Sequence, residues 1–204
     1  PITMEEARQP MGAHKRVHIQ KISKIDSVRQ RWIEKHGKEP AEADVDRMFA
    51  DFVPMQEACL SEYSELIPGT LDVVNACKDR GIKIGTTTGY LTGMTEINRK
   101  DAERQGYSPD CTVCAADVSE GRPGPFMCLQ NMIKLQVSPV EACVKVDDTV
   151  PGVEEGLNAG MWTVGLAISG NEVGLTLAEW NALPKAEQEA KRAYAYRRMQ
   201  TAGA

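Results

Sequence analysis

Two adjacent carboxylates, Asp147 and Asp148, follow a short apolar stretch and have the chemistry of a magnesium site. Mg²⁺ accepts one or two protein carboxylates and completes its octahedron with water and phosphate oxygens. The alternative is an aspartate that caps the following helix, which explains one of the two residues but explains an adjacent pair poorly. The pair is therefore the strongest single indication of chemistry in the sequence.

Two further segments carry groups that suit an anion. Thr86-Thr87-Thr88-Gly89-Tyr90 places hydroxyls and a glycine between a predicted strand and a predicted helix, where backbone N–H groups can face a phosphate. Arg122 stands in a loop whose prolines and glycines restrict the backbone and can aim its guanidinium at a phosphoryl oxygen. Each signal is weak alone, because Thr-Gly turns are common and surface arginines are usually solvated.

The pattern of helices and strands brings these segments to one edge of a sheet. We predict four strands, over residues 82–85, 111–114, 142–146 and 162–166. We predict helices around them, over residues 70–81, 92–105, 125–135, 150–158 and 184–199. Strands that alternate with helices at this spacing predict a parallel sheet covered on both faces. Ligands bind at the carboxyl ends of such strands, which is where the threonines, the arginine and the aspartates are expected.

Residues 1–66 differ, because they contain no strand candidate. A capping box, Thr3-Met-Glu-Glu6, starts a first short helix, and Pro10-Met11-Gly12 interrupts the chain after it. Further helices are predicted over residues 13–22, 27–36 and 41–63, the last with apolar residues at helical spacing. We therefore expect a helical cap over residues 1–66 and an α/β core over residues 67–204, with a hinge near Pro68-Gly69.

Composition excludes several classes of function. The 204 residues carry a net charge of −5, and Lys and Arg are scattered rather than gathered on one stripe. No nucleic-acid partner is therefore expected, and an anionic small molecule has to be held by a local cluster of residues. No apolar run is long enough for a membrane span. Six cysteines without a signal peptide predict a cytoplasmic protein with reduced thiols.

The spacing of Cys111-Thr-Val-Cys114 invites a zinc or redox interpretation. No second CxxC and no paired histidines accompany it, as a zinc site requires. We therefore predict that the pair belongs to a short strand.

The order of the chemical segments resembles the haloacid dehalogenase superfamily of phosphoryl-transfer enzymes. The resemblance implies a Rossmann-like parallel core with an α-helical cap, in which Thr88 and Arg122 orient the phosphoryl oxygens. It also implies that Asp148 holds Mg²⁺, with Asp147 as a possible supporting carboxylate. The superfamily's first motif, a strand that ends in the aspartate nucleophile, has no counterpart here. We expect that this strand, and the C-terminal end of the core, lie outside the 204 residues. Some relatives carry an aspartate where this chain has Gly152, so position 152 is not expected to supply a carboxylate.

Other segments are similar to the phosphonoacetaldehyde hydrolase family within that superfamily. They are Glu5–Gly12 with the following Lys15 and His18, Gly81–Tyr90, Gly121–Pro123, Asp148-Thr149 and Gly160–Val164. The resemblance implies cleavage of the carbon–phosphorus bond of phosphonoacetaldehyde to acetaldehyde and phosphate, in organic phosphonate catabolism. It further implies a homodimer formed through the cap, where Met48, Phe49 and Phe52 serve either as interface or as core.

By this resemblance Lys15 forms a Schiff base with the substrate aldehyde. Carbon is a poor leaving group, but a protonated imine at the neighbouring carbon accepts the electrons of the breaking bond. The attacking amine must be neutral, so the pKa of Lys15 has to lie well below its reference of about 10.4. Met11, His18, Gly89 and Tyr90 are expected to line the substrate pocket, with His18 on the same helix face as Lys15.

Two alternatives remain open. Another enzyme of the superfamily, a phosphatase or sugar phosphomutase acting on P–O bonds, needs the core motifs but no imine-forming lysine. A non-catalytic fragment or interaction module is the second alternative, because a sheet without its nucleophile strand leaves two neighbouring strands unpaired.

Overall fold

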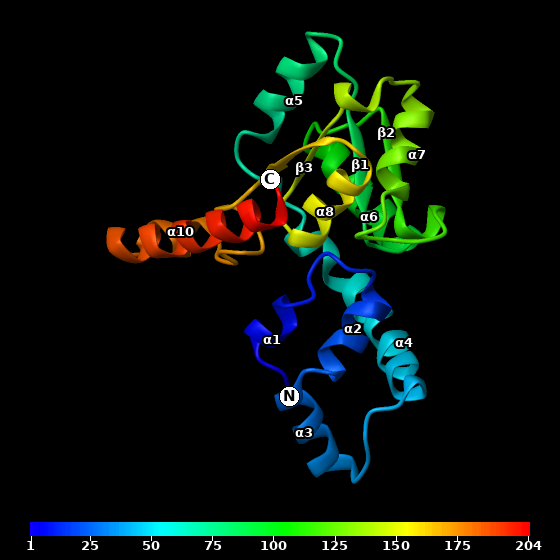
Figure 1. The fold of residues 1–204 in the computed structure, drawn as a ribbon, viewed down its shortest axis with the longest axis vertical. Coiled ribbons are helices and arrows are strands. Elements are labelled where there is room, and N and C mark those ends of the chain that lie inside the picture. Colours follow the sequence, from blue (N-terminus) through cyan, green and yellow to red (C-terminus); the bar gives the residue numbers. More distant parts are fainter.

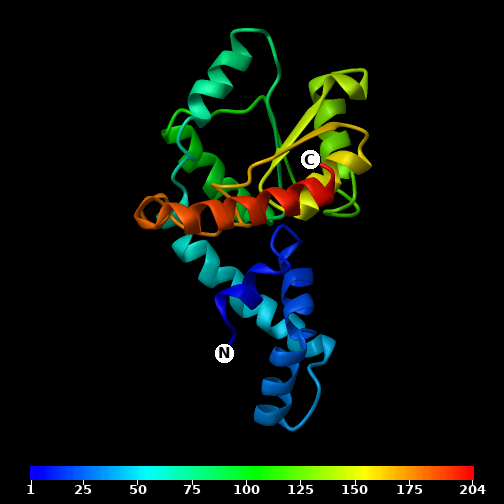
Figure 2. The same ribbon diagram turned by 60° about the vertical axis from the view of Figure 1, so that its left-hand side comes forward.

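A computed structural model describes all 204 residues and contains two groups of elements (Figure 1). Helices of the N-terminal third lie together in the lower half of the view: α1 (Met4–Arg8), α2 (Lys15–Ser23), α3 (Asp26–His36), α4 (Glu42–Cys59) and the 3₁₀ turn η1 (Leu60–Tyr63). Figure 2 shows the same separation from a second direction.

The remaining residues alternate helix and strand, as the sequence pattern predicts. In chain order these elements are α5 (Thr70–Lys78), β1 (Gly85–Thr88), α6 (Thr92–Arg104), β2 (Cys111–Cys114), η2 (Ala115–Asp117), α7 (Phe126–Leu135), η3 (Val140–Ala142), β3 (Val144–Asp147), α8 (Val150–Asn158), β4 (Trp162–Gly165), α9 (Leu177–Ala182) and α10 (Lys185–Ala202). None of the helices combines the length and the apolar character that a bilayer crossing demands.

The strands pair in parallel, which confirms the predicted α/β class. β1 pairs with β2 so that Thr88 lies opposite Cys114, and β3 pairs with β4 so that Asp147 lies opposite Gly165. The expected single sheet is instead two two-stranded sheets, because β1 and β3 form no ladder with each other. Each of these two strands therefore keeps one edge without a strand partner.

The prediction of the first strand over residues 82–85 is wrong by three residues. Ile82 still belongs to the turn that ends α5, since its N–H donates to the carbonyl of Cys77 at 3.0 Å. The strand begins at Gly85 and contains the three threonines, whose β-branched side chains favour extended backbone. Only Gly89 and Tyr90 therefore lie in the predicted anion-binding loop.

The strand predicted over residues 142–146 is also displaced. Ala142 closes the turn η3, and the strand runs Val144–Asp147, so Asp147 is the last strand residue and only Asp148 lies beyond it. The helix start predicted at Thr70 has no side-chain cap; Gly69, at φ +84°, is the capping residue. The capping box at Thr3 and the strand Cys111–Cys114 are confirmed.

The cysteine pair has no partner for a metal. Cys111 and Cys114 lie on a short strand, where residues three apart point to opposite faces. All six cysteines are free thiols. The zinc interpretation of this spacing therefore finds no support in the structure.

Ion pairs hold the helix that carries Lys15. Arg16 of α2 binds two carboxylates of α4, with its Nε 2.7 Å from Asp46 Oδ1 and its Nη2 3.0 Å from Glu42 Oε2. The buried side chain of Val45 lies on α4 between these two acidic residues. The start of α2 is thereby fixed against the longest helix of its group.

Candidate active site

A glycine-containing loop brings the helical group onto the sheet edge. Gly12 has φ +91°, and a Cβ there would lie 2.6 Å from Thr149 Oγ1, at the start of α8. A Cβ on Gly89, after β1, would lie 3.3 Å from the carbonyl oxygen of Gly12. The absence of side chains at both glycines permits this approach, since real Cβ contacts are rarely so short. The loop before α2 therefore lies between the ends of β1 and β3.

Lys15 follows this loop as the first residue of α2 and turns toward the core. Its Nζ lies 4.9 Å from the centroid of the Tyr90 ring. Burial lowers the pKa of Lys15 from its ordinary value. The alternative of a freely solvated helix lysine does not describe this half-buried side chain.

His18 is engaged within the helical group. Its Nε2 makes a 2.8 Å hydrogen bond with the carbonyl oxygen of Ala7, and its Nδ1 has no partner. Burial lowers the pKa of His18, against the opposing influence of the bond to Ala7. Met11 lies in the loop and is partly buried. Neither side chain makes a polar contact with Lys15 in this structure.

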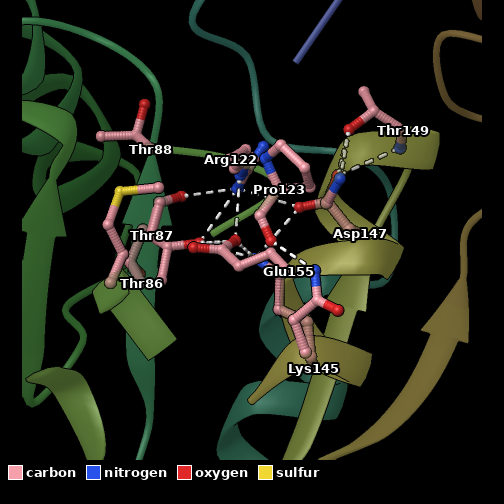
Figure 3. A network of polar contacts seen from close by, with 12 residues as sticks. Thr86, Thr87, Thr88, Arg122, Pro123, Lys145, Asp147, Thr149 and Glu155 are labelled. Carbon is pink, nitrogen blue, oxygen red and sulfur yellow. Dashed lines mark hydrogen bonds and ion pairs between the residues drawn. The ribbon is translucent and has the colours of Figure 1, made fainter. Parts of the chain in front are cut away.

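The side chain of Arg122 is buried in the α/β core, beside the carboxyl ends of the strands (Figure 3). Its Nε donates to Glu155 Oε2 at 3.0 Å, and its Nη2 donates to Thr87 Oγ1 at 2.9 Å. The same Nη2 lies 3.0 Å from Asp147 Oδ2. Only 9% of the side chain is exposed, so the interpretation of Arg122 as a solvated surface residue is wrong.

A second buried cation shares these partners. Lys145 Nζ lies 2.6 Å from Thr87 Oγ1, 3.0 Å from Glu155 Oε2 and 3.1 Å from Asp147 Oδ2. Two cations and two carboxylates thus form one network around Thr87, in which every buried charge is paired. Figure 3 shows the network between β1 and β3.

Sequence reasoning missed three members of the network: Thr87, Lys145 and Glu155. A signal for Lys145 existed, because it stands two residues before Asp147 on a predicted strand and so shares its face. A charged residue inside a strand of a covered parallel sheet requires a buried partner. No comparable signal marked Thr87 over its neighbour Thr88 or Glu155 over Glu154.

The two adjacent aspartates have different surroundings. Asp147 Oδ1 accepts from the Thr149 N–H at 3.0 Å and from its hydroxyl at 2.8 Å. Burial alone raises the pKa of Asp147, but the charges of Arg122 and Lys145 outweigh it and the pKa is lowered. For Asp148, burial and then the charge of Asp147 raise the pKa.

Asp148 is the carboxylate at this edge that has no cationic partner. Its Oδ2 accepts from the N–H of Asn171 at 3.0 Å, and no ion pair involves it. No cluster of three or more His, Cys, Asp or Glu side chains that could hold a metal is present, so Asp148 is the one carboxylate that this sheet edge offers without a cationic partner. One carboxylate is compatible with Mg²⁺, which takes its other ligands from water and phosphate.

Thr88 and Gly89 end β1 beside this network. Thr88 Oγ1 accepts from the N–H of Tyr90 at 3.2 Å, and no protein group accepts a hydrogen bond from this hydroxyl. In Figure 3 its side chain lies apart from the bonds around Arg122, which involve Thr87 instead. The Thr88 hydroxyl is therefore available as a donor at the strand end.

The architecture and this edge of charged residues define the class of the protein. Residues 3–160 match the family model described as a haloacid dehalogenase-like hydrolase. A crystal structure of β-phosphoglucomutase from Clostridium difficile shares the fold, with a TM-score of 0.64 at 19% identity over 98% of this chain and 83% of that one. The chain is a member of the haloacid dehalogenase-like hydrolases.

Three closer relatives narrow the class. The chain is 48% identical over 204 residues to the phosphonoacetaldehyde hydrolase of Hahella chejuensis, covering all of this chain and 69% of that protein. It is 46% identical over 203 residues to the enzyme of the same name from Syntrophobacter fumaroxidans, of which it covers 73%. The crystal structure of a phosphonoacetaldehyde hydrolase-like protein from Oleispira antarctica matches all of this chain and 74% of its own, with a TM-score of 0.97 at 44% identity. Within its class, the chain belongs to the phosphonoacetaldehyde hydrolase family.

Proposed function

We propose that this protein cleaves the carbon–phosphorus bond of phosphonoacetaldehyde, releasing acetaldehyde and phosphate. The observation that carries the proposal is the half-buried amine of Lys15, which lies 4.9 Å from the Tyr90 ring at the end of β1. A lysine that binds a phosphoryl oxygen acts in its charged form, whereas imine formation requires the neutral amine, which the lowered pKa of Lys15 favours. The names of the relatives at 46–48% identity support the same substrate.

Lys15 acts first in this mechanism. Its neutral amine attacks the aldehyde carbon, and uptake of one proton from solvent with loss of water gives a protonated imine. The electrons of the C–P bond then move into this imine, so the two-carbon fragment leaves phosphorus as an enamine. Protonation of the enamine and hydrolysis of the imine release acetaldehyde and regenerate Lys15. Met11, Gly89 and Tyr90 line the space around the aldehyde in this proposal, and His18 supports the helix face that carries Lys15.

The core residues hold the phosphoryl group. Arg122 and the Thr88 hydroxyl neutralise and orient its oxygens, since phosphoryl transfer depends mainly on positioning and electrostatics. Asp148 is the ligand proposed for Mg²⁺, which when bound balances the charge of the phosphoryl oxygens. Asp147 supports this arrangement through Arg122.

The aspartate that attacks phosphorus is proposed to come from a strand between β1 and β3. Both strands keep an edge without a strand partner, and a parallel strand can pair with both edges at once. A carboxylate at the end of that strand reaches phosphorus next to Asp148, Thr88 and Arg122. The aspartyl phosphate formed there is then hydrolysed by water.

In this proposal residues 1–66 form the cap and residues 67–204 form the core. The cap closes over the core and excludes water from the site. Gln105, directly after α6, holds the connecting loop. Its side-chain oxygen accepts from the N–H of Leu66 at 2.9 Å, and its side-chain nitrogen donates to the carbonyl of Ser64 at 2.8 Å. A cavity of about 440 Å³ lies at this junction, lined in part by Tyr90. We place the hinge at Pro68-Gly69, just after the residues that the bonds of Gln105 hold.

The test is product release by the complete gene product, in wild-type form and as Lys15→Ala. We expect wild-type protein to produce acetaldehyde and phosphate in equal amounts, and Lys15→Ala to lose about 10³-fold or more of this activity. Lys21→Ala, at an exposed lysine of the same helix, is the matched control and should retain activity. If Lys15→Ala still releases acetaldehyde and phosphate, the proposed role of Lys15 fails. If the wild-type protein hydrolyses only phosphate monoesters, the P–O alternative is correct.

A further inference from the structure

Glu155 is a fully buried carboxylate on α8 to which the proposed reaction gives no role. Its Oε2 accepts from Arg122 Nε at 3.0 Å, from Lys145 Nζ at 3.0 Å and from the Thr87 hydroxyl at 3.2 Å. A buried carboxylate is stable only when cations and donors compensate its lost hydration. The position of the Glu155 carboxylate therefore constrains the positions of Arg122, Lys145 and Thr87, which bind it.

The guanidinium of Arg122 is held on two sides by carboxylates from different elements. Glu155 of α8 binds Nε, and Asp147 of β3 binds Nη2. The group is planar, so fixing two of its nitrogens also fixes the direction of the third. Nη1 is the one nitrogen of Arg122 that has no hydrogen-bond partner in the protein.

Helix α8 also makes room for the second carboxylate. A Cβ on Gly152 would lie 2.0 Å from Asp147 Cγ and 2.1 Å from its Oδ1, so the Asp147 carboxylate occupies the space that a side chain at 152 requires. Gly152 precedes Glu155 by three residues, which puts both positions on one face of the helix. This face of α8 therefore carries the carboxylate of Glu155, and the carboxylate of Asp147 from β3 packs against it at Gly152.

Lys145 balances the charge of this arrangement. Its Nζ contacts both carboxylates, so Arg122 and Lys145 together match the charges of Asp147 and Glu155. The four side chains are neutral as a group, which is the condition for burying them together.

We infer that Glu155 is a positioning residue that, with Asp147 in the space above Gly152, holds Arg122 so that only Nη1 remains for a phosphoryl oxygen. The inference rests on the proposed role of Arg122 as the cation that binds the phosphoryl group. Positioning and simple charge balance predict opposite effects. Loss of the Glu155 charge leaves an excess cation, which by electrostatics alone tightens the binding of an anion, whereas loss of positioning weakens it.

The experiment measures the binding of inorganic phosphate to the complete gene product by calorimetry. Glu155→Gln keeps the size of the side chain and removes its charge, and we expect phosphate to bind about tenfold or more weakly. Glu154→Gln, at the neighbouring residue without an ion pair, is the matched control and should bind phosphate as wild-type protein does. Unchanged or tighter binding by Glu155→Gln overturns the inference.

Arg122→Lys separates this inference from the proposed function. If Arg122→Lys binds phosphate as wild-type protein does, the proposed role of Arg122 fails. If Arg122→Lys weakens binding and Glu155→Gln does not, the role of Arg122 stands and the positioning by Glu155 fails.

A second set of variants moves the Asp147 carboxylate to position 152 and leaves Glu155 unchanged. These variants test the positioning of Arg122 even if Glu155→Gln does not fold. Asp147→Gly and Gly152→Asp should each weaken phosphate binding, the first by loss of the partner of Nη2 and the second by collision with Asp147. The double variant Asp147→Gly/Gly152→Asp returns one carboxylate to the same space. We expect its affinity to exceed that of either single variant; a double variant no better than the worse single one contradicts the inference.

Discussion

At the scale of single residues, burial separates Lys15 from the other lysines of its helix. Lys21 is exposed, as is Lys24 directly after the helix, whereas Lys15 lies against the Tyr90 ring. Burial disfavours the charged ammonium form and lowers the pKa of Lys15. The ring face acts in the opposite direction, because it attracts a cation, and so limits the decrease.

This lowered pKa predicts a pH dependence for the reactivity of Lys15. The neutral amine fraction grows as pH rises through the pKa, so labelling of Lys15 by an amine reagent should reach half its maximum below about pH 10.4, the value for a solvated lysine. Mass spectrometry of the labelled peptide at each pH measures this midpoint. The same protein unfolded in urea is the control, and identical midpoints in the two states would contradict the prediction.

The site residues that could be predicted are those whose neighbours in the sequence form a recognisable pattern. Asp148, Arg122 and Lys15 were predicted as site residues from a carboxylate pair, a rigid loop and a family segment, and the structure brings their segments to one edge. Thr87 and Glu155 could not be identified, because their significance depends on partners 35 and 33 residues away from them along the chain. Such pairings exist only once the fold is formed.

At the scale of elements, the position of strand β1 was the main error of prediction. Ile82 and Ile84 looked like the strand because they are apolar and alternate with a lysine. The structure uses them in the passage from α5 to the sheet, where the Ile84 N–H donates to Asp110 Oδ2 at 2.8 Å. The threonines that follow provide the paired backbone, so hydrophobic alternation indicated an element here but not its register.

The loop before α2 carries a prediction of its own. Gly12→Ala puts a Cβ 2.6 Å from Thr149 Oγ1 and should separate the loop from the core, lowering kcat/KM by about tenfold or more. Gly37→Ala is the matched control, because Gly37 also has a left-handed φ, +70°, but a methyl group added there would meet no atom within 4 Å.

Both substitutions should lower the free energy of unfolding by about 1 kcal/mol, the cost of a left-handed alanine. Only Gly12→Ala should lose activity, as steady-state kinetics of the two variants will establish. Equal activity of the two variants would show that close approach of this loop to Thr149 is not needed for turnover.

At the scale of the whole molecule, the two sheets leave apolar surface uncovered. Val144 and Val146 of β3 lie on one face with Trp162 and Val164 of β4, and all four are exposed, Trp162 by 68%. The inner edges of β1 and β3 also lack strand partners. Unpaired edges beside exposed apolar faces favour association between chains.

We therefore predict that these 204 residues, expressed alone, are inactive and associate. Size-exclusion chromatography with light scattering should report large species for this chain and a defined species for the complete gene product. Trp162→Glu, which puts a charge on the exposed face, should reduce association of the isolated chain. A monodisperse, active isolated chain would contradict the prediction.

The proposed homodimer through the cap belongs to the same scale. Met48, Phe49 and Phe52 are all half-buried in the single chain. The Phe49 ring lies 5.9 Å from the ring of His14, so part of its surface is already used inside the helical group. Met48 and Phe52 are the better candidates for contact with a second copy.

The central claim is that the Lys15 amine forms an imine with the substrate aldehyde, and borohydride reduction tests it most directly. The complete gene product is mixed with phosphonoacetaldehyde, reduced, digested and examined by peptide mass spectrometry. We predict one stable two-carbon adduct, on Lys15, that is absent when either substrate or borohydride is omitted. Release of acetaldehyde and phosphate by a protein that shows no adduct on Lys15 would contradict the account.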